Sequence, residues 1–408
     1  MNQKPSIPYN PHILVWAREY FRYSLEEAAE KAGISGIKGT KKQPAQTPAQ
    51  RLKDWEQGIA TPTISQLEIL AHKAYRMPVL VFFLENPPQD KEHFEDYRTV
   101  GDSIYAKETP EFAAFKRKII ILQEMLRDIH TKLNDRKKSF VNSFSQIGQP
   151  KRLVNIIRNI IDLPFESQRA IKSPSALFTT IRELISGIGI YTIVDGDLGS
   201  YHSAIDPETF RGMSICDEYA PLIVINSNDK FAQAKLFTLI HEVSHIFLGV
   251  TSISNVNPFG NRTNLRDIER FCNAVAAEFL APAERLYSSW KRLGLEGIAA
   301  IKLLANEYKL SLMAMARRLN DEKLLGDDDY WAFFQYRKQQ YLESQKKVKE
   351  KAKETQRKYS KNLSYCFGES TILTLAKAYN SNLLTYKELA LALQARLDKV
   401  QQYVMINK

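Results

Sequence analysis

His241 and His245 flank Glu242 in an H-E-x-x-H pattern, the clearest chemical motif of the chain. Residues four apart lie on one face of a helix, so both imidazoles can reach a single zinc ion at about 2.0–2.1 Å. The flanking residues predict such a helix over Phe231 to Leu248, which Gly249 ends. Glu242 directly follows the first histidine and is therefore placed beside the ion, where a carboxylate can act as a general base.

A hydrolytic zinc site needs a third protein ligand and an open coordination position. We expect Glu269 to be that ligand, on a helix predicted over Asp267 to Leu280. Glu269 and Asn273 are one turn apart and share a strip beside the apolar face of this helix. Glu278 lies about half a turn further round, at roughly 100° per residue, and faces away. Asp267 is also off that face and lies too close to the preceding loop to be fixed.

Three further residues each allow two interpretations. Asn273 can accept a ring N–H from a ligating histidine and hold its tautomer, or it can fill a buried capping or packing position. His202 can help to bind the oxyanion of the reaction, or it is a solvated loop histidine. Cys272 can approach the metal, or it is a small buried residue.

The chemistry that these residues predict is hydrolysis. A zinc ion held by two neutral histidines and a carboxylate lowers the pKa of a bound water molecule toward about 7. Glu242 then takes the proton of that water and passes it to the leaving amine, while the metal polarises the scissile carbonyl. We therefore predict a Zn²⁺ site with the metal ligands His241, His245 and Glu269 and with Glu242 as the catalytic residue.

Helices are the elements that must position these residues. Strands are expected at two places only, Tyr191 to Val194 and Leu222 to Ile225, which are short and rich in β-branched residues. The fold class we expect is mainly α, with a small α+β zincin-like peptidase domain, a five-helix N-terminal module and a helical C-terminal extension. Helical periodicity is found in short stretches between residues 12 and 84, over 110–133, around 153–161 and 175–185, and from 231 onward.

The composition is that of a globular protein of 408 residues, 44% of them hydrophobic and 25% charged. No apolar run approaches the roughly 20 residues of a membrane span, and the polar N-terminus carries no apolar signal segment. Three scattered cysteines form no disulfide framework, so we expect a cytoplasmic protein. The excess positive charge behind the net +11 lies around 116–152 and 346–361. These blocks are either solvated helix faces or surfaces for nucleic acid or another acidic partner.

The segments 236–245 (L-F-T-L-I-H-E-V-S-H) and 269–282 (E-R-F-C-N-A-V-A-A-E-F-L-A-P) closely resemble the ImmA/IrrE family of zinc metallopeptidases. The family pattern is F-T-x-x-H-E-x-x-H, then E-x-x-A-N-x-F-A-x-x-L-L-x-P; here Cys272 replaces the usual Ala and Val275 the usual Phe. The resemblance covers roughly residues 96 to 305. It implies the same three metal ligands and the same catalytic glutamate. It also implies a substrate that is a repressor or antitoxin-like protein encoded nearby.

The N-terminal residues resemble the Xre-type helix-turn-helix domains that are often fused to these peptidases. A helix-turn-helix joins its two helices by a turn of about 3–4 residues. Here Gly36 to Ala49 interrupts that junction, just before the expected recognition helix near Gln50 to Trp55. The unit either binds DNA or has a protein-docking or architectural role. The resemblance is carried by W-A-R-E at 16–19, S-L-E-E-A-A at 24–29, G-I-S at 33–35, W-E-Q-G at 55–58 and T-P-T at 61–63.

We expect three domains: an Xre-like helix-turn-helix domain at 1–95, a zinc peptidase domain at 96–305 and a helical C-terminal extension at 306–408. The leading function is a zinc endopeptidase that cleaves a specific protein partner in a stress, mobile-element or toxin–antitoxin system. One alternative is a DNA-binding transcriptional regulator whose zinc domain senses or binds a partner. Another is an antitoxin-type binding module in which the metal only stabilises the fold.

Overall fold

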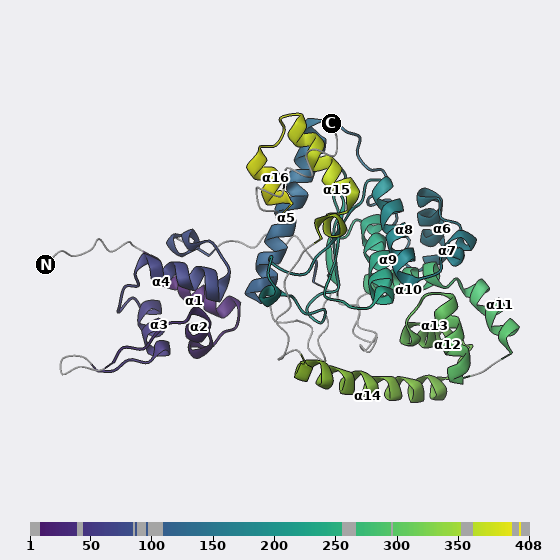
Figure 1. Cartoon of the computed structure of the whole chain (residues 1–408), viewed down its shortest axis with the longest axis horizontal. Helices are drawn as coiled ribbons and strands as arrows, with labels where there is room; N and C mark the ends of the chain where they lie inside the picture. The colour runs from purple at the N-terminus through teal and green to yellow at the C-terminus, as the bar shows by residue number, and fades with distance from the viewer. Residues whose placement is uncertain are drawn as a thin grey trace. The chain divides into compact units, whose positions relative to one another are not determined.

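The chain divides into two compact units, Met1–Glu92 with Ala106–Ile120 and His93–Tyr105 with Ile121–Lys408. Helices dominate both units and the second contains a small sheet (Figure 1). The expected fold class, mainly α with a small α+β domain, is therefore confirmed. Among the described residues, no helix combines the length and the apolarity that crossing a membrane requires. The computed structural model describes residues 9–38, 44–84, 86–87, 95–96, 109–254, 267–294, 297–351, 362–393 and 400.

The first unit is a group of short helices whose ends carry clear sequence signals. Ser24 and Glu27 bond to each other's backbone N–H groups and form a capping box at the start of α2. After α4 the chain continues as one π-helical segment, which ends at Arg76 in the left-handed conformation. The elements are α1 (Pro11–Tyr20), α2 (Leu25–Ala32), α3 (Pro48–Glu56), α4 (Ile64–Ile69), the π-helical segment Leu70–Tyr75 and a 3-10 helix, Val79–Phe83.

The junction between α2 and α3 is a bridged loop and not a tight turn. Ile37 and Gln46 form an antiparallel backbone bridge, so the two ends of the junction lie side by side. The side chains of Gln46 and Gln50 donate to the two carboxylate oxygens of Asp54 at 2.8 and 2.9 Å. Because Asp54 is buried in α3, the bond from Gln46 ties the Ile37–Gln46 bridge to the helix that was expected to read DNA.

The second unit contains a mixed sheet of five strands in the order β1-β5-β3-β4-β2. β2 lies parallel to β4 and β1 parallel to β5, whereas β3 is antiparallel to both β4 and β5. The two predicted strands are confirmed as β2 and β4. Sequence reasoning missed β3 and β5, because these short strands place glycine and serine where an apolar alternation is the usual signal. The strands are β1 (Glu95–Asp96), β2 (Tyr191–Val194), β3 (Gly212–Ile215), β4 (Leu222–Ile225) and β5 (Ser252–Ser254).

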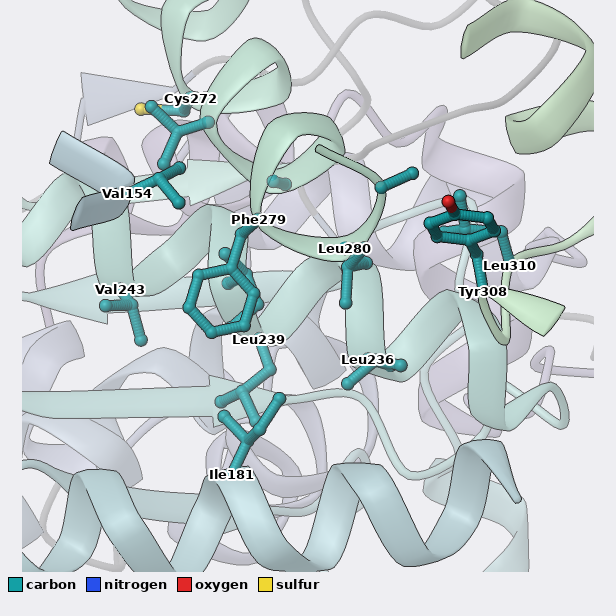
Figure 2. Close-up of a cluster of buried hydrophobic side chains, with 14 of the residues drawn as sticks. Val154, Ile181, Leu236, Leu239, Val243, Cys272, Phe279, Leu280, Tyr308 and Leu310 are labelled. Atoms are coloured by element: carbon teal, nitrogen blue, oxygen red, sulfur yellow. The ribbon is translucent and has the colours of Figure 1, made fainter. Parts of the chain in front are cut away.

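α9 is the central helix of the second unit and packs on β3, β4, α8 and α10. Figure 2 shows Leu239 and Val243 of α9 near Phe279 of α10 and Ile181 of α8. This apolar cluster fixes the relative place of the two helices that carry the expected metal ligands. The helices are α5 (Pro110–Lys132), within which the two units divide, α6 (Pro150–Ile161), α7 (Phe165–Ala170), α8 (Pro174–Gly187), α9 (Ala232–Leu248), α10 (Asp267–Leu280), α11 (Ala283–Leu293), α12 (Gly297–Glu307), α13 (Leu312–Asp321), α14 (Asp327–Lys351), α15 (Leu363–Asn380) and α16 (Tyr386–Ala392).

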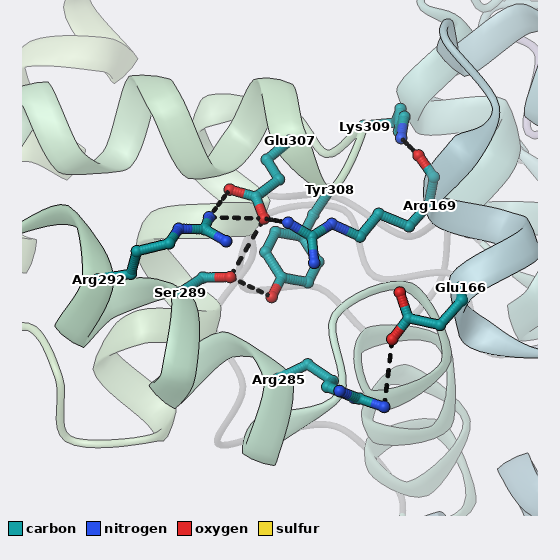
Figure 3. Close-up of polar contacts among 8 residues, drawn as sticks. All are labelled: Glu166, Arg169, Arg285, Ser289, Arg292, Glu307, Tyr308 and Lys309. Atoms are coloured by element: carbon teal, nitrogen blue, oxygen red, sulfur yellow. Dashed lines mark hydrogen bonds and ion pairs between the residues drawn. The ribbon is translucent and has the colours of Figure 1, made fainter.

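Residues after 305 share the core of the helices that carry the site. Leu310 and Phe334 belong to the same buried hydrophobic cluster as the inner faces of α9 and α10. Figure 3 shows the Glu307 carboxylate, at the end of α12, accepting hydrogen bonds from Arg169 of α7 and Arg292 of α11. The helices on both sides of residue 305 are thus joined by apolar and ionic contacts.

α15 packs against β2, an edge strand of the sheet. The Arg182 guanidinium joins them, because it donates to the carbonyls of Tyr365 and Cys366 in α15 and of Thr192 in β2 at 2.5, 2.9 and 2.7 Å. Gly368 has φ 73° and interrupts α15 just after these carbonyls. The guanidinium therefore supplies donors that a continuous helix would have provided. Burial lowers the pKa of Arg182 to about 10.

Candidate metal centre

Three expected ligand side chains meet between α9 and α10. His241 and His245 lie one turn apart on α9, and Glu269 lies in the first turn of α10. The Nε2 atoms of the two histidines are 3.1 Å apart. One carboxylate oxygen of Glu269 lies 3.3 Å from His241 Nε2, and the other lies 2.9 Å from His245 Nε2. The imidazoles are fully buried and Glu269 is 3% exposed. All three ligand atoms lie within 4.8 Å of one another and form a group that could hold a metal ion.

The spacing of this group fits a metal ion. Ligand atoms bound to a tetrahedral zinc ion at about 2.0–2.1 Å lie roughly 3.3 Å apart. Two imidazole nitrogens 3.1 Å apart share at most one proton between them, whereas a cation satisfies both nitrogens and the carboxylate together. Nitrogen and oxygen donors from two histidines and a carboxylate are also a donor set that zinc accepts.

The charges of the group keep the Glu269 carboxylate ionised. Burial alone would raise the pKa of Glu269, but the two facing imidazoles lower it to about 2. Burial alone would lower the pKa of His241, but Glu269, helped by Glu242 and Asn273, raises it above its ordinary value. The Glu269 carboxylate is therefore ionised at neutral pH, as a metal ligand must be.

α10 is held in place at the end opposite to Glu269. Arg158, Gln168 and Arg318 donate to the three consecutive carbonyls of residues 279–281 at 2.6, 3.2 and 3.0 Å. A helix leaves such carbonyls unpaired at its C-terminus, and cations there also favour the helix dipole. Because the helix is rigid, these buried contacts help to position the Glu269 ligand at its first turn.

The acidic residues that were not expected to bind the metal have other partners. The carboxylate of Glu278 accepts a hydrogen bond from the buried guanidinium of Arg318 on α13. Asp267 is exposed and pairs with Arg270, three residues on. Both placements agree with the helical-face argument that favoured Glu269.

Asn273 lies on the side of α10 that faces His241. Its carboxamide is close enough to raise the pKa of the His241 ring. In the part of the chain that the structure describes, neither Asn273 Oδ1 nor His241 Nδ1 has a partner at hydrogen-bonding geometry, although both atoms are buried. The two atoms are complementary, because a ring N–H donates and a carboxamide oxygen accepts.

Cys272 and His202 lie in contrasting surroundings. Cys272 is fully buried in the hydrophobic cluster, and burial raises the pKa of its thiol well above the ordinary value. This fits the interpretation of a small buried residue. His202 lies exposed in the 3-10 turn Tyr201–Ser203, and the buried metal-binding group does not include it. Its role in binding an oxyanion stays a prediction.

Glu242 is fully buried and faces β5. Ser254 Oγ donates to Glu242 Oε1, and Ser252 Oγ lies 3.5 Å from Glu242 Oε2. Burial raises the pKa of Glu242, and the two imidazoles and Ser254 oppose that rise. Sequence reasoning missed both serines; the only available signal was the spacing of two hydroxyl residues across one apolar residue in S-I-S.

Two imidazoles from successive turns of one helix and a carboxylate from a second helix define the class of a metallopeptidase centre. A comparison with protein-family models agrees, because residues 192–320 match Peptidase M78, described as the IrrE N-terminal-like domain. The matched residues include α9 and α10 with all four expected site residues. They are less than half of the chain and lie outside the N-terminal unit, so the helix-turn-helix domain stays a prediction. A comparison with curated proteins found no match.

Proposed function

We propose that the protein is a zinc-dependent endopeptidase that cleaves a specific protein partner. The observation that carries this proposal is the convergence of His241, His245 and Glu269 around a position that fits one ion, with Glu242 on the same helix as the histidines. The match of residues 192–320 to a metallopeptidase family supports the same chemistry.

The four side chains have separate tasks. His241 and His245 would hold zinc through Nε2, and Glu269 would hold it through its carboxylate. Zinc supplies a Lewis acid that polarises the scissile carbonyl and makes water more acidic. Glu242 takes a proton from the attacking water as general base and later delivers it to the leaving amine as general acid.

The substrate that we propose is a repressor or antitoxin-like protein encoded near this chain's own gene, in a stress, mobile-element or toxin–antitoxin system. The support is the sequence resemblance around the site together with the Xre-like N-terminal residues. We also propose action in the cytoplasm, which suits the three free thiols of Cys216, Cys272 and Cys366.

The test compares the purified full chain with Glu242→Gln and His245→Ala. We expect the wild type and Glu242→Gln to bind one zinc ion each and His245→Ala to bind none, because only the histidine is a ligand. Co-expression with the products of neighbouring genes should give a cleaved partner with the wild type alone. Metal content is measured by mass spectrometry and cleavage by intact-mass analysis of the partner.

Asp267→Asn is the matched control, because it removes an exposed carboxylate from the same turn as Glu269. It should keep both zinc and cleavage. A zinc-free wild type would end the proposal. If the wild type binds zinc but, like Glu242→Gln, leaves the partner uncleaved, a regulator or binding module would be favoured instead.

A further inference from the structure

The face of the sheet next to Glu242 is built from very small residues. In the register of β3 and β5, Gly212 pairs with Ser254 and Ser214 pairs with Ser252. Alternate residues of a strand point to the same face, so these four lie together. Contacts from Gly212, Ser252 and Ser254 to the Glu242 side chain show that this face is turned toward α9.

The hydroxyls approach both oxygens of the carboxylate. Ser254 Oγ donates to Glu242 Oε1, Ser252 Oγ lies 3.5 Å from Oε2, and Ser214 Oγ lies 2.9 Å from Ser252 Oγ. All four side chains are fully buried. Each carboxylate oxygen can accept two hydrogen bonds, so the serines leave acceptor capacity on Glu242 for a water molecule.

Gly212 completes this arrangement by leaving space. A Cβ atom there would lie 2.3 Å from Glu242 Oε1 and 2.6 Å from Thr238 Cγ2. Any larger residue would therefore displace the carboxylate that Ser254 holds.

Packing alone does not explain these residue types. β4 lies beside β3 and presents Ile223 and Ile225, opposite Ser214 and Gly212, to the hydrophobic core. Branched apolar residues suit strands, whereas glycine weakens them and a buried hydroxyl is unfavourable unless it is hydrogen-bonded.

We propose that Ser254, supported by Ser252 and Ser214, is a positioning residue that fixes the Glu242 carboxylate for proton transfer. The inference rests on the proposed peptidase function, because it concerns the orientation of that function's general base. Ser254 itself does not touch the reacting atoms.

The test measures how tightly acetohydroxamic acid binds to the zinc-loaded full chain, by isothermal titration calorimetry. This probe binds zinc through its two oxygens and gives its acidic proton to a neighbouring base. Ser254→Ala should retain one zinc ion and bind the probe roughly tenfold more weakly, as expected for the loss of a hydrogen bond to a charged group. Ser254→Thr restores the hydroxyl and should bind within about twofold of the wild type.

Ser289→Ala is the matched control, because Ser289 is also buried and donates to a glutamate, Glu307, at 3.1 Å on α12. It should leave probe binding unchanged. Ser254→Ala that binds the probe like the wild type, or that loses zinc, overturns the positioning role. The proposed function fails separately, if the wild type binds no zinc or if Glu242→Gln binds the probe as tightly as the wild type.

Discussion

At the scale of single residues, the metal centre brings ionisable groups together in a buried position. An unpaired charge there would be unfavourable by several kcal/mol, and the group avoids this by setting Glu269 against two imidazoles. A bound cation is a stronger partner for the same atoms. The free energy of metal binding is therefore also available to stabilise the fold.

Asn273→Ala is expected to lower zinc affinity by about 10–100-fold, the usual effect of removing a group that orients a ligating histidine. Asn273→Asp keeps an acceptor oxygen and should retain most of the affinity. Competition with a chromophoric zinc chelator measures both variants. An alanine variant with wild-type affinity would mean that Asn273 only packs α10.

At the scale of elements, the two ligand-bearing helices have different supports. α9 lies within the apolar core, between the sheet and the helices α8 and α10. α10 depends in addition on the buried arginines at its C-terminal end, Arg158 and Arg318. Arg158 also lies over the ring of Phe279, with its guanidinium carbon 4.3 Å from the ring centre. The position of Glu269 thus depends on side chains from α6 and α13.

Arg158→Met should lower the free energy of unfolding by about 2 kcal/mol, because three carbonyl or amide acceptors lose a charged donor. Urea unfolding of the zinc-loaded chain measures the change. Arg152→Met, on the exposed side of α6, should change it by less than about 0.5 kcal/mol. Equal effects of the two variants would contradict the capping argument.

The helices of the site could be predicted almost to the residue. The helix expected over Asp267 to Leu280 is α10, and α9 begins one residue after the expected Phe231. Amphipathic periodicity and end signals are local, so the sequence contains them. β3 and β5 could not be predicted, because Gly212 and Ser254 occupy these strands where they adjoin the Glu242 carboxylate of α9, a contact that has no local sequence signal. The capping of α10 by Arg158, 121 positions from Phe279, likewise has no local signal.

At the scale of the whole molecule, zinc would join two helices of a unit whose core also includes residues after 305. Loss of the metal should therefore lower the stability of the whole second unit. With zinc at about 1,000 times its dissociation constant, binding adds roughly 4 kcal/mol to stability.

Removal of zinc by a chelator is expected to lower the melting temperature of the wild type by several degrees. His245→Ala should melt at one temperature with or without the chelator, because it has no zinc to lose. Differential scanning calorimetry measures both chains. A chelator effect on His245→Ala would place the stabilising metal elsewhere.

In the described part of the N-terminal unit, several side chains of the expected recognition helix are turned inward or engaged within the unit. α3 buries Asp54, Trp55 and Glu56, and Arg51 donates to a backbone carbonyl. We therefore expect the full chain to bind DNA from upstream of its own gene no more tightly than unrelated DNA in a mobility-shift assay. A specific shift that survives physiological salt would instead support the DNA-binding regulator.

The contact between α15 and β2 has a consequence for any shortened form of the protein. β2 is the last strand in the order of the sheet, and all four of its residues are buried. A chain cut before Leu363 would lose the helix that packs against this strand and the carbonyls that Arg182 holds. An uncovered apolar strand at a sheet margin recruits strands from other molecules. Such a truncation should self-associate, even though it would keep every residue of the metal centre.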